Sequence, residues 1–201
     1  MPVSSSTELA LTHRRRLLAL AREAIEYGCR TGARFHFDNR EEKDPLAEPR
    51  AVFVTLHDAR GALRGCIGTL AARYPLGEAV VTHAHQAAFR DPRFAPVVIA
   101  ETRVLEIEIS VLSPPSPLPA RTESDLLEAL APGLDGLILA EGARTATFLP
   151  QVWEQLSDPR AFLTALKRKA SLPGEYWSET IAFAPYRALR FREADPGGLS
   201  P

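Results

Sequence analysis

Hydrophobic and polar residues alternate with a period of two in two parts of the chain. The first part, RAVFVTLHDARGALRGCIGTL at residues 50–70, alternates on both sides of a D-A-R-G turn and predicts a β-hairpin. The second, VLEIEISVL at residues 104–112, predicts a strand with one face exposed to water. Helical spacing of apolar residues instead predicts two helices, one with apolar positions from Leu17 to Gly28 and one over residues 76–90.

The second half of the chain repeats these patterns in shorter segments. Thr122 and Asp125 have the spacing of a helix capping box, and GLILAE and RTATFL predict two strands that pair across Gly142. Helices are predicted at residues 151–156 and 160–170, and a last hairpin around Pro185-Tyr186. Because helices and strands do not strictly alternate, we expect an α+β fold: an antiparallel sheet flanked by helices, with a second, smaller α+β subdomain.

Proline positions suggest where the chain divides. The 17 prolines are a high number for 201 residues, and four of them stand in SPPSPLP at residues 113–119, which predicts an extended connector. We therefore expect a larger subdomain of residues 1–118 with 178–193, which holds both termini. Residues 119–177 are expected to form the smaller subdomain, and residues 194–201 a disordered tail.

Composition limits the possible functions without naming one. The 24 basic and 25 acidic side chains leave a formal charge of −1, so no overall field attracts nucleic acid or a membrane surface. Two cysteines cannot form a disulfide scaffold, and the first residues lack the order of a signal peptide. We expect a cytoplasmic protein that binds no membrane and for which nucleic-acid binding is not favoured.

The predicted hairpin carries Cys66, one of the two cysteines of the chain. If Asp58 to Gly61 form its turn, Phe53 lies opposite Cys66, and Leu63 belongs to the core face. Arg64 and Cys66 then stand on one strand face, about 7 Å apart, where a guanidinium favours a thiolate. Cys66 is therefore a candidate reactive thiol, and the alternative is a half-buried cysteine that fills a gap in the packing.

No histidine has a convincing place beside Cys66. In this register His57 stands about 13 Å along the strand, too far for a Cys-His pair. His83 and His85 point about 200° apart on their helix, so at most one faces the hairpin. The same spacing argues against a metal site, and no cofactor is expected because phosphate-binding and dinucleotide-binding motifs are missing.

Two carboxylates mark the strand at residues 104–112. Glu106, Glu108 and Ser110 share one face, while Leu105, Ile107, Ile109 and Val111 take the core face. Carboxylates about 7 Å apart are candidates for acid-base chemistry, and the alternative is the water-exposed side of the sheet.

Seven blocks of the sequence closely resemble the AMMECR-domain family, also called AmmeMemoRadiSam system protein A. The most specific is Leu63-Arg64-Gly65-Cys66-Ile67-Gly68-Thr69, and the others follow in the expected order: AREAIEYG, PLGEAV, DPRFAPV, EIEISVLSPP, FLPQVW and FLTALKRKASLPGEYW. The resemblance implies a two-part α+β fold whose functional surface carries Arg64, Gly65, Cys66, Gly68 and Thr69, with Asp91, Arg93 and Phe94 beside them. His83 and His85 depart from the pattern of the family.

The resemblance also implies partners, namely a Memo-family protein and a radical SAM enzyme. Our first hypothesis is a ligand- or partner-binding accessory component that acts with these proteins through a cleft lined by residues 64–69. The alternative is an enzyme that uses Cys66 as nucleophile or redox centre, assisted by Glu106, Glu108 or a histidine. A weaker alternative, suggested by the 21 arginines, is an RNA-associated factor.

Overall fold

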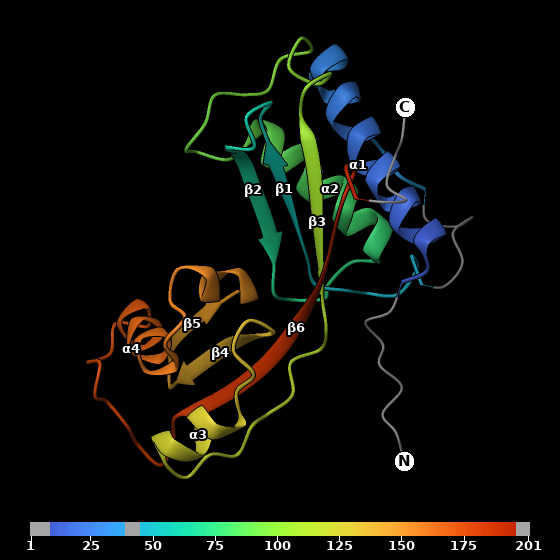
Figure 1. Cartoon of the computed structure of the whole chain (residues 1–201). Coiled ribbons are helices and arrows are strands. Elements are labelled where there is room, and N and C mark those ends of the chain that lie inside the picture. Colours follow the sequence, from blue (N-terminus) through green and yellow to red (C-terminus); the bar gives the residue numbers. More distant parts are fainter. Residues whose placement is uncertain (1–8, 39–44, 196–201) are drawn as a thin grey trace. The chain divides into compact units, whose positions relative to one another are not determined.

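A computed structural model describes residues 9–38 and 45–195, and the chain forms two compact units (Figure 1). The first unit comprises residues 1–112 and 189–201, and the second comprises residues 113–188. Four α-helices and antiparallel strands make this an α+β fold, as the sequence pattern predicts. The disordered tail predicted at residues 194–201 lies outside the described residues from position 196 on. None of the helices in the described parts is long and apolar enough to cross a membrane.

The first unit places two helices against the sheet. Its elements are α1 (Leu11–Thr31), β1 (Val52–His57), β2 (Leu63–Thr69), α2 (Leu76–Phe89) and β3 (Glu106–Leu112). The strands are antiparallel in the order β2-β1-β3, followed by the end of β6. Helix α1 buries the apolar residues that its spacing predicts and ends at Gly32, whose φ of 70° favours glycine.

The core of the first unit lies between the helices and one face of these strands. Val52, Val54 and Leu56 of β1 are fully buried, and so are the odd-numbered residues 107–111 of β3. Since side chains alternate across a strand, this burial fixes which residues point away from the helices. The predicted functional residues with even numbers, among them Cys66 and Glu108, are on that other face, whereas Gly65 and Thr69 of β2 lie on the side of the helices.

The second unit has a core of its own, with two stacked aromatic rings, Trp153 and Phe162, at its centre. Its elements are α3 (Glu123–Ala129), β4 (Asp135–Glu141), β5 (Arg144–Phe148), the 3-10 helix η2 (Pro150–Glu154), α4 (Pro159–Lys169) and the start of β6 (Ala182–Arg192). The predicted capping box is present, because Thr122 accepts from the N–H of Asp125 and Asp125 accepts from the N–H of Thr122. Strands β4 and β5 pair as predicted.

The predicted hairpin at Pro185-Tyr186 is wrong, because β6 is one continuous strand. Pro185 lies opposite Leu137 of β4. Its carbonyl accepts from the N–H of Ser116 at 3.1 Å, on the side of the extended 113–118 connector. The N–H and C=O of a strand residue point to the same neighbour, so the missing N–H of Pro185 costs no hydrogen bond to β4. A proline on this side can therefore stand inside the strand.

Candidate functional site

The β1–β2 hairpin pairs in a register two residues away from the predicted one. Thr55, not Phe53, lies opposite Cys66, and the ladder is irregular between Leu56 and His57. The turn is longer than four residues, because Asp58 Oδ1 accepts from the backbone N–H groups of Arg60 and Ala62. Leu63, predicted in the core, is instead exposed at this irregular end of β2.

A shift of two residues keeps every other side chain on its predicted face but gives Cys66 new neighbours. Thr55 Oγ1 donates to Cys66 Sγ at 3.3 Å. On its other side Thr55 lies opposite Glu108 of β3. Cys66, Thr55 and Glu108 therefore form one row across three strands, on the face turned away from α1 and α2.

The prediction that Glu106, Glu108 and Ser110 form a water-exposed face of β3 is wrong for the last two. Glu108 and Ser110 are each only 2 % exposed, while Glu106 is half-buried. Burial is possible because Arg192, at the end of β6, donates from Nε to Glu108 Oε2 at 2.5 Å. Glu108 and Glu106 share a face as predicted, but the carboxylate of Glu108 is held in an ion pair.

Asp91 organises the outer edge of β2. Its carboxylate accepts from the N–H of Cys66 at 2.9 Å and from Nε and Nη2 of Arg93 at 2.9 and 2.6 Å. Arg93 Nη2 also reaches the carbonyl oxygen of Cys66 at 3.4 Å. The hydrogen bond from Arg93 is the main reason why the pKa of Asp91 lies well below its usual range, although Asp91 is buried. The two side chains thus bind both backbone polar groups of Cys66.

Arg64 does not turn its charge towards Cys66. Its Nε and Nη2 donate to the two carboxylate oxygens of Glu101 at 2.9 and 3.1 Å, and Nη1 donates to the carbonyl of Ala95. The same pair lowers the pKa of Glu101. Arg64 therefore fastens β2 to the segment that follows α2, and the guanidinium beside the Cys66 backbone is that of Arg93.

The two glycines of the RGCIGT segment allow close approach of the protein's own atoms. A Cβ on Gly65 would stand 2.3 Å from the carbonyl oxygen of Ala87 in α2. A Cβ on Gly68 would stand 2.3 Å from the ring of Phe53. Thr69 Oγ1 accepts from the N–H of Ala71. Phe94 is one of the residues that the family resemblance places beside this segment. Its ring lies 5.4 Å from the Arg93 guanidinium.

The corrected register also brings His57 closer to Cys66 than predicted. His57 is two residues beyond Thr55, so it is a diagonal neighbour of Cys66, about 7–8 Å away rather than 13 Å. Its Nε2 is 3.8 Å from Glu108 Oε2, and its Nδ1 is 3.3 Å from the carbonyl of Gly61. No imidazole or carboxylate in the described parts of the chain hydrogen-bonds to Cys66 Sγ.

The other histidines belong to the packing of α2. His83 is buried with Nδ1 3.0 Å from Gln86 Oε1, and burial lowers its pKa. The His85 ring packs against Phe89, 4.9 Å between centroids. Within residues 9–38 and 45–195, no three His, Cys, Asp or Glu side chains gather closely enough to hold a metal ion.

The residues missed by the sequence analysis are those that arrive from distant segments. Thr55 could have been found, because it shares the face of Cys66 by strand parity. Glu101 and Arg192 carry no sequence signal that connects them with Arg64 and Glu108, since 37 and 84 residues separate the pairs.

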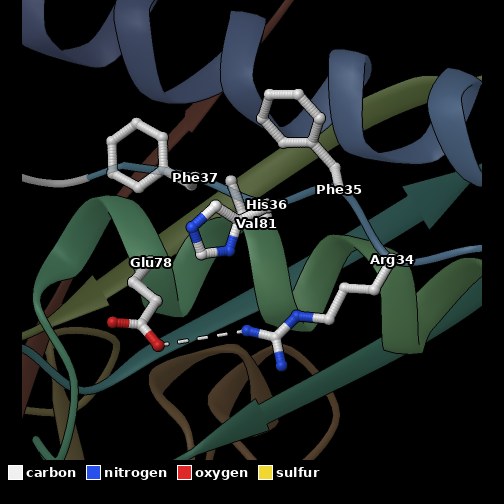
Figure 2. Close-up of a pocket in the computed structure, with 6 residues that line it drawn as sticks. All are labelled: Arg34, Phe35, His36, Phe37, Glu78 and Val81. Atoms are coloured by element: carbon white, nitrogen blue, oxygen red, sulfur yellow. Dashed lines mark ion pairs between the residues drawn. The ribbon is translucent and has the colours of Figure 1, made fainter.

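A separate cavity lies between the segment after α1 and helix α2. It has a volume of about 450 Å³, and Arg34, His36 and Glu78 bring polar groups to it (Figure 2). Phe37 fits over Gly77, where a Cβ would stand 2.6 Å from the ring. None of the predicted site residues lines this cavity.

Comparisons with known proteins agree on one family. A family model described as AMMECR1 matches residues 18–191. Protein MK0488 of Methanopyrus kandleri is 38 % identical over 193 residues, which covers 90 % of this chain and 89 % of the relative. Protein PF1979 of Pyrococcus furiosus is 37 % identical over 188 residues, with 90 % and 89 % covered. The crystal structure of uncharacterized protein PH0010 from Pyrococcus horikoshii has a TM-score of 0.80 and 36 % identity, covering 92 % of this chain and 94 % of that one.

Proposed function

The chain belongs to the AMMECR1 family, and we propose that it is a binding component without chemistry of its own, which holds an anionic group of a ligand or partner beside Cys66. The observation that carries the proposal is the arrangement of Asp91. Asp91 binds the Cys66 N–H and the Arg93 guanidinium at once, so a half-exposed cation and a half-buried thiol are fixed next to each other.

Arg93 supplies the binding group in this proposal. Asp91 occupies Nε and Nη2, while Nη1 has no partner among the described residues. The guanidinium side chain is 55 % exposed, and its contact with the Phe94 ring limits its movement. A carboxylate or phosphate oxygen could accept from Nη1 without breaking the bonds to Asp91.

The Memo-family protein and the radical SAM enzyme implied by the motif resemblance are the partners that we propose, in the cytoplasm. An accessory component of this kind would present or retain a substrate for a reaction carried out by another protein. The two cysteines are free, which is compatible with a reducing compartment.

Binding to these two proteins, each purified from the same organism, tests the proposal by titration calorimetry. Arg93→Gln removes the cation and should weaken binding at least tenfold, because charge-assisted hydrogen bonds are among the stronger contacts. Cys66→Ser should weaken it less, and Cys29→Ser, in α1, serves as the control that changes nothing. Equal affinity of the wild type and Arg93→Gln, or no binding to either protein, would refute the proposal.

The enzyme hypothesis rests on one observation, the hydrogen bond from Thr55 Oγ1 to Cys66 Sγ, which orients the sulfur. It lacks a base that contacts the thiol. The rate of Cys66 alkylation by iodoacetamide between pH 6 and pH 9, compared with that of N-acetylcysteine, separates the hypotheses. A Cys66 that reacts no faster than the free thiol at every pH favours the binding component. If Cys66→Ser keeps binding but abolishes an activity, the chain is an enzyme.

A further inference from the structure

The segment between α2 and β3 exposes aliphatic side chains that a water-facing loop does not need. Val98, Ile99 and Val104 are 57 %, 51 % and 54 % exposed. They stand within three consecutive turns, closed by hydrogen bonds from Glu101 to Val98, from Thr102 to Ile99 and from Val104 to Glu101. Single exposed apolar residues are ordinary, but three of them within residues 98–104 of one ordered segment point to an interaction surface.

The exposed group is held in place by the rest of the first unit, although the segment is neither helix nor strand (Figure 1). Arg22 of α1 donates to the carbonyls of Thr102 and Leu105, and it also pairs with Glu193. On the other side, Glu101 is bound by Arg64. A surface that is already ordered loses little conformational entropy when a partner binds.

A depression adjoins the exposed group. Ile99 and Arg103 line it, together with Glu26 of α1, and its volume is about 530 Å³. The depression is large enough to receive a side chain of a partner, which is how apolar anchors bind at the centre of protein interfaces.

The exposed group carries unpaired positive charge, because Glu26 in the depression pairs with Arg30 at 3.6 Å and leaves Arg103 without a partner carboxylate among the described residues. Arg90 and Arg103 are exposed and form no ion pair with any described residue. The two acidic residues of the segment, Asp91 and Glu101, are neutralised by Arg93 and Arg64. A partner that covers this surface would meet unpaired positive charge at the rim of an apolar centre.

We infer that Val98, Ile99 and Val104, together with Arg103, form a docking patch for a partner protein segment that carries aliphatic or aromatic side chains flanked by Asp or Glu. Apolar side chains of the partner would cover the three aliphatic residues, and its carboxylates would pair with Arg103 and Arg90. The docking patch does not rest on the proposed anion site at Cys66 and Arg93.

A second copy of this chain fits the docking patch less well. In a twofold dimer the same patch occurs on both sides of the interface. Arg103 of one copy would then approach the same surface of the other, where Glu26, Asp91 and Glu101 already pair with Arg30, Arg93 and Arg64. The charge of the docking patch therefore favours a different protein as the occupant.

Selection of peptides from a random linear library, displayed on phage and bound to the full chain, tests this inference without assuming a partner. The enriched peptides should combine Asp or Glu with Leu, Ile, Phe or Trp. In fluorescence anisotropy the best of them should bind Val98→Ser/Val104→Ser at least tenfold more weakly than the wild type. Arg103→Glu should also weaken it, and the affinity should fall as salt is added.

Matched substitutions in the second unit show whether a loss of peptide binding is specific to the docking patch or follows from removing any exposed aliphatic or basic side chain. Leu134→Ser removes an equally exposed aliphatic residue, at 57 %, from the second unit, and Arg160→Glu reverses an exposed charge there. Both should bind the peptide like the wild type. Cys66→Ser should do so too, so failure of the docking patch and failure of the proposed anion site give different results.

Three outcomes would overturn the inference. The first is a selection that yields no peptide able to distinguish the wild type from Val98→Ser/Val104→Ser. The second is enrichment of peptides without acidic residues. The third is a dimer of the wild type in analytical ultracentrifugation that Val98→Ser/Val104→Ser converts to a monomer, because the patch would then join two copies of the chain.

Discussion

Replacing Asp91 with Asn tests whether one buried carboxylate holds the edge of β2 in place. Asn has nearly the same shape but no charge, and its NH2 group replaces one accepting oxygen, so it cannot keep both the bonds at Oδ2, from Cys66 N–H and Arg93 Nη2, and those at Oδ1, from the N–H and Nε of Arg93. Hydrogen bonds to a charged group are worth roughly 1.5–3 kcal/mol each. Because Arg93 is half exposed and can be hydrated again, we expect a total loss of about 2–3 kcal/mol.

This loss corresponds to a fall of roughly 5–10 °C in the melting temperature of a chain of this size. Circular dichroism follows the helices of both units, whereas both tryptophans, Trp153 and Trp177, lie in the second unit, so fluorescence follows that unit alone. Glu101→Gln is the matched control. It breaks the ion pair with Arg64, but this carboxylate is one third exposed, so we expect a loss of about 1 kcal/mol or less.

The pH dependence gives an independent check on the same residue. Since the pKa of Asp91 is lowered in the folded state, its stabilising effect is complete above the unfolded value of about 4. It is lost only as the pH falls through the lower, folded value. The difference between the wild type and Asp91→Asn should therefore stay constant from pH 8 to about pH 5 and narrow below about pH 4. A difference that is below about 0.5 kcal/mol at pH 7, or that already shrinks between pH 7 and pH 5, would refute the reasoning.

Three further predictions concern packing and buried charge. Gly65→Ala should cost about 2–3 kcal/mol in urea unfolding, because its Cβ would overlap the carbonyl oxygen of Ala87, and a loss below about 0.5 kcal/mol would contradict this. Glu123→Gln should cost about 1–2 kcal/mol, because it removes the negative charge 2.6 Å from the fully buried Lys167 ammonium but keeps an accepting oxygen at a position that is 35 % exposed, whereas Lys167→Met should be nearly neutral; equal losses would count against this account. Burial lowers the pKa of His83, so unfolding free energy should fall as the pH drops through the unfolded value of about 6.5, and His83→Gln should reduce this fall; an unchanged profile would contradict it.

The features of the fold that depend only on residues close together in the sequence could be predicted from local patterns. The helical spacing from Leu17 to Gly28, the capping box at Thr122 and the alternation along β1 and β3 each follow from a few consecutive side chains. Burial of one strand face is likewise local, because parity alone decides which residues point to the core. The α+β class follows from these elements together.

Features that depend on distant segments could not be predicted in this way. The burial of Glu108 requires an arginine 84 residues later in the chain. Pro185 looked like the centre of a turn, and only its position beside the proline-rich connector makes a continuous strand possible. The hairpin register was wrong because the side chain of Asp58 binds two N–H groups and lengthens the turn.

The corrected register changes how the candidate site should be interpreted. A shift of two residues leaves Cys66 on its predicted face. The residue opposite the sulfur, however, is Thr55 with its hydroxyl group and not the aromatic Phe53. His57 moves within diagonal reach of Cys66, yet its Nδ1 faces the carbonyl of Gly61 at 3.3 Å. Its Nε2 lies 3.8 Å from Glu108 Oε2. Among the described residues no base contacts Cys66, and this supports the proposed binding component more than the enzyme hypothesis.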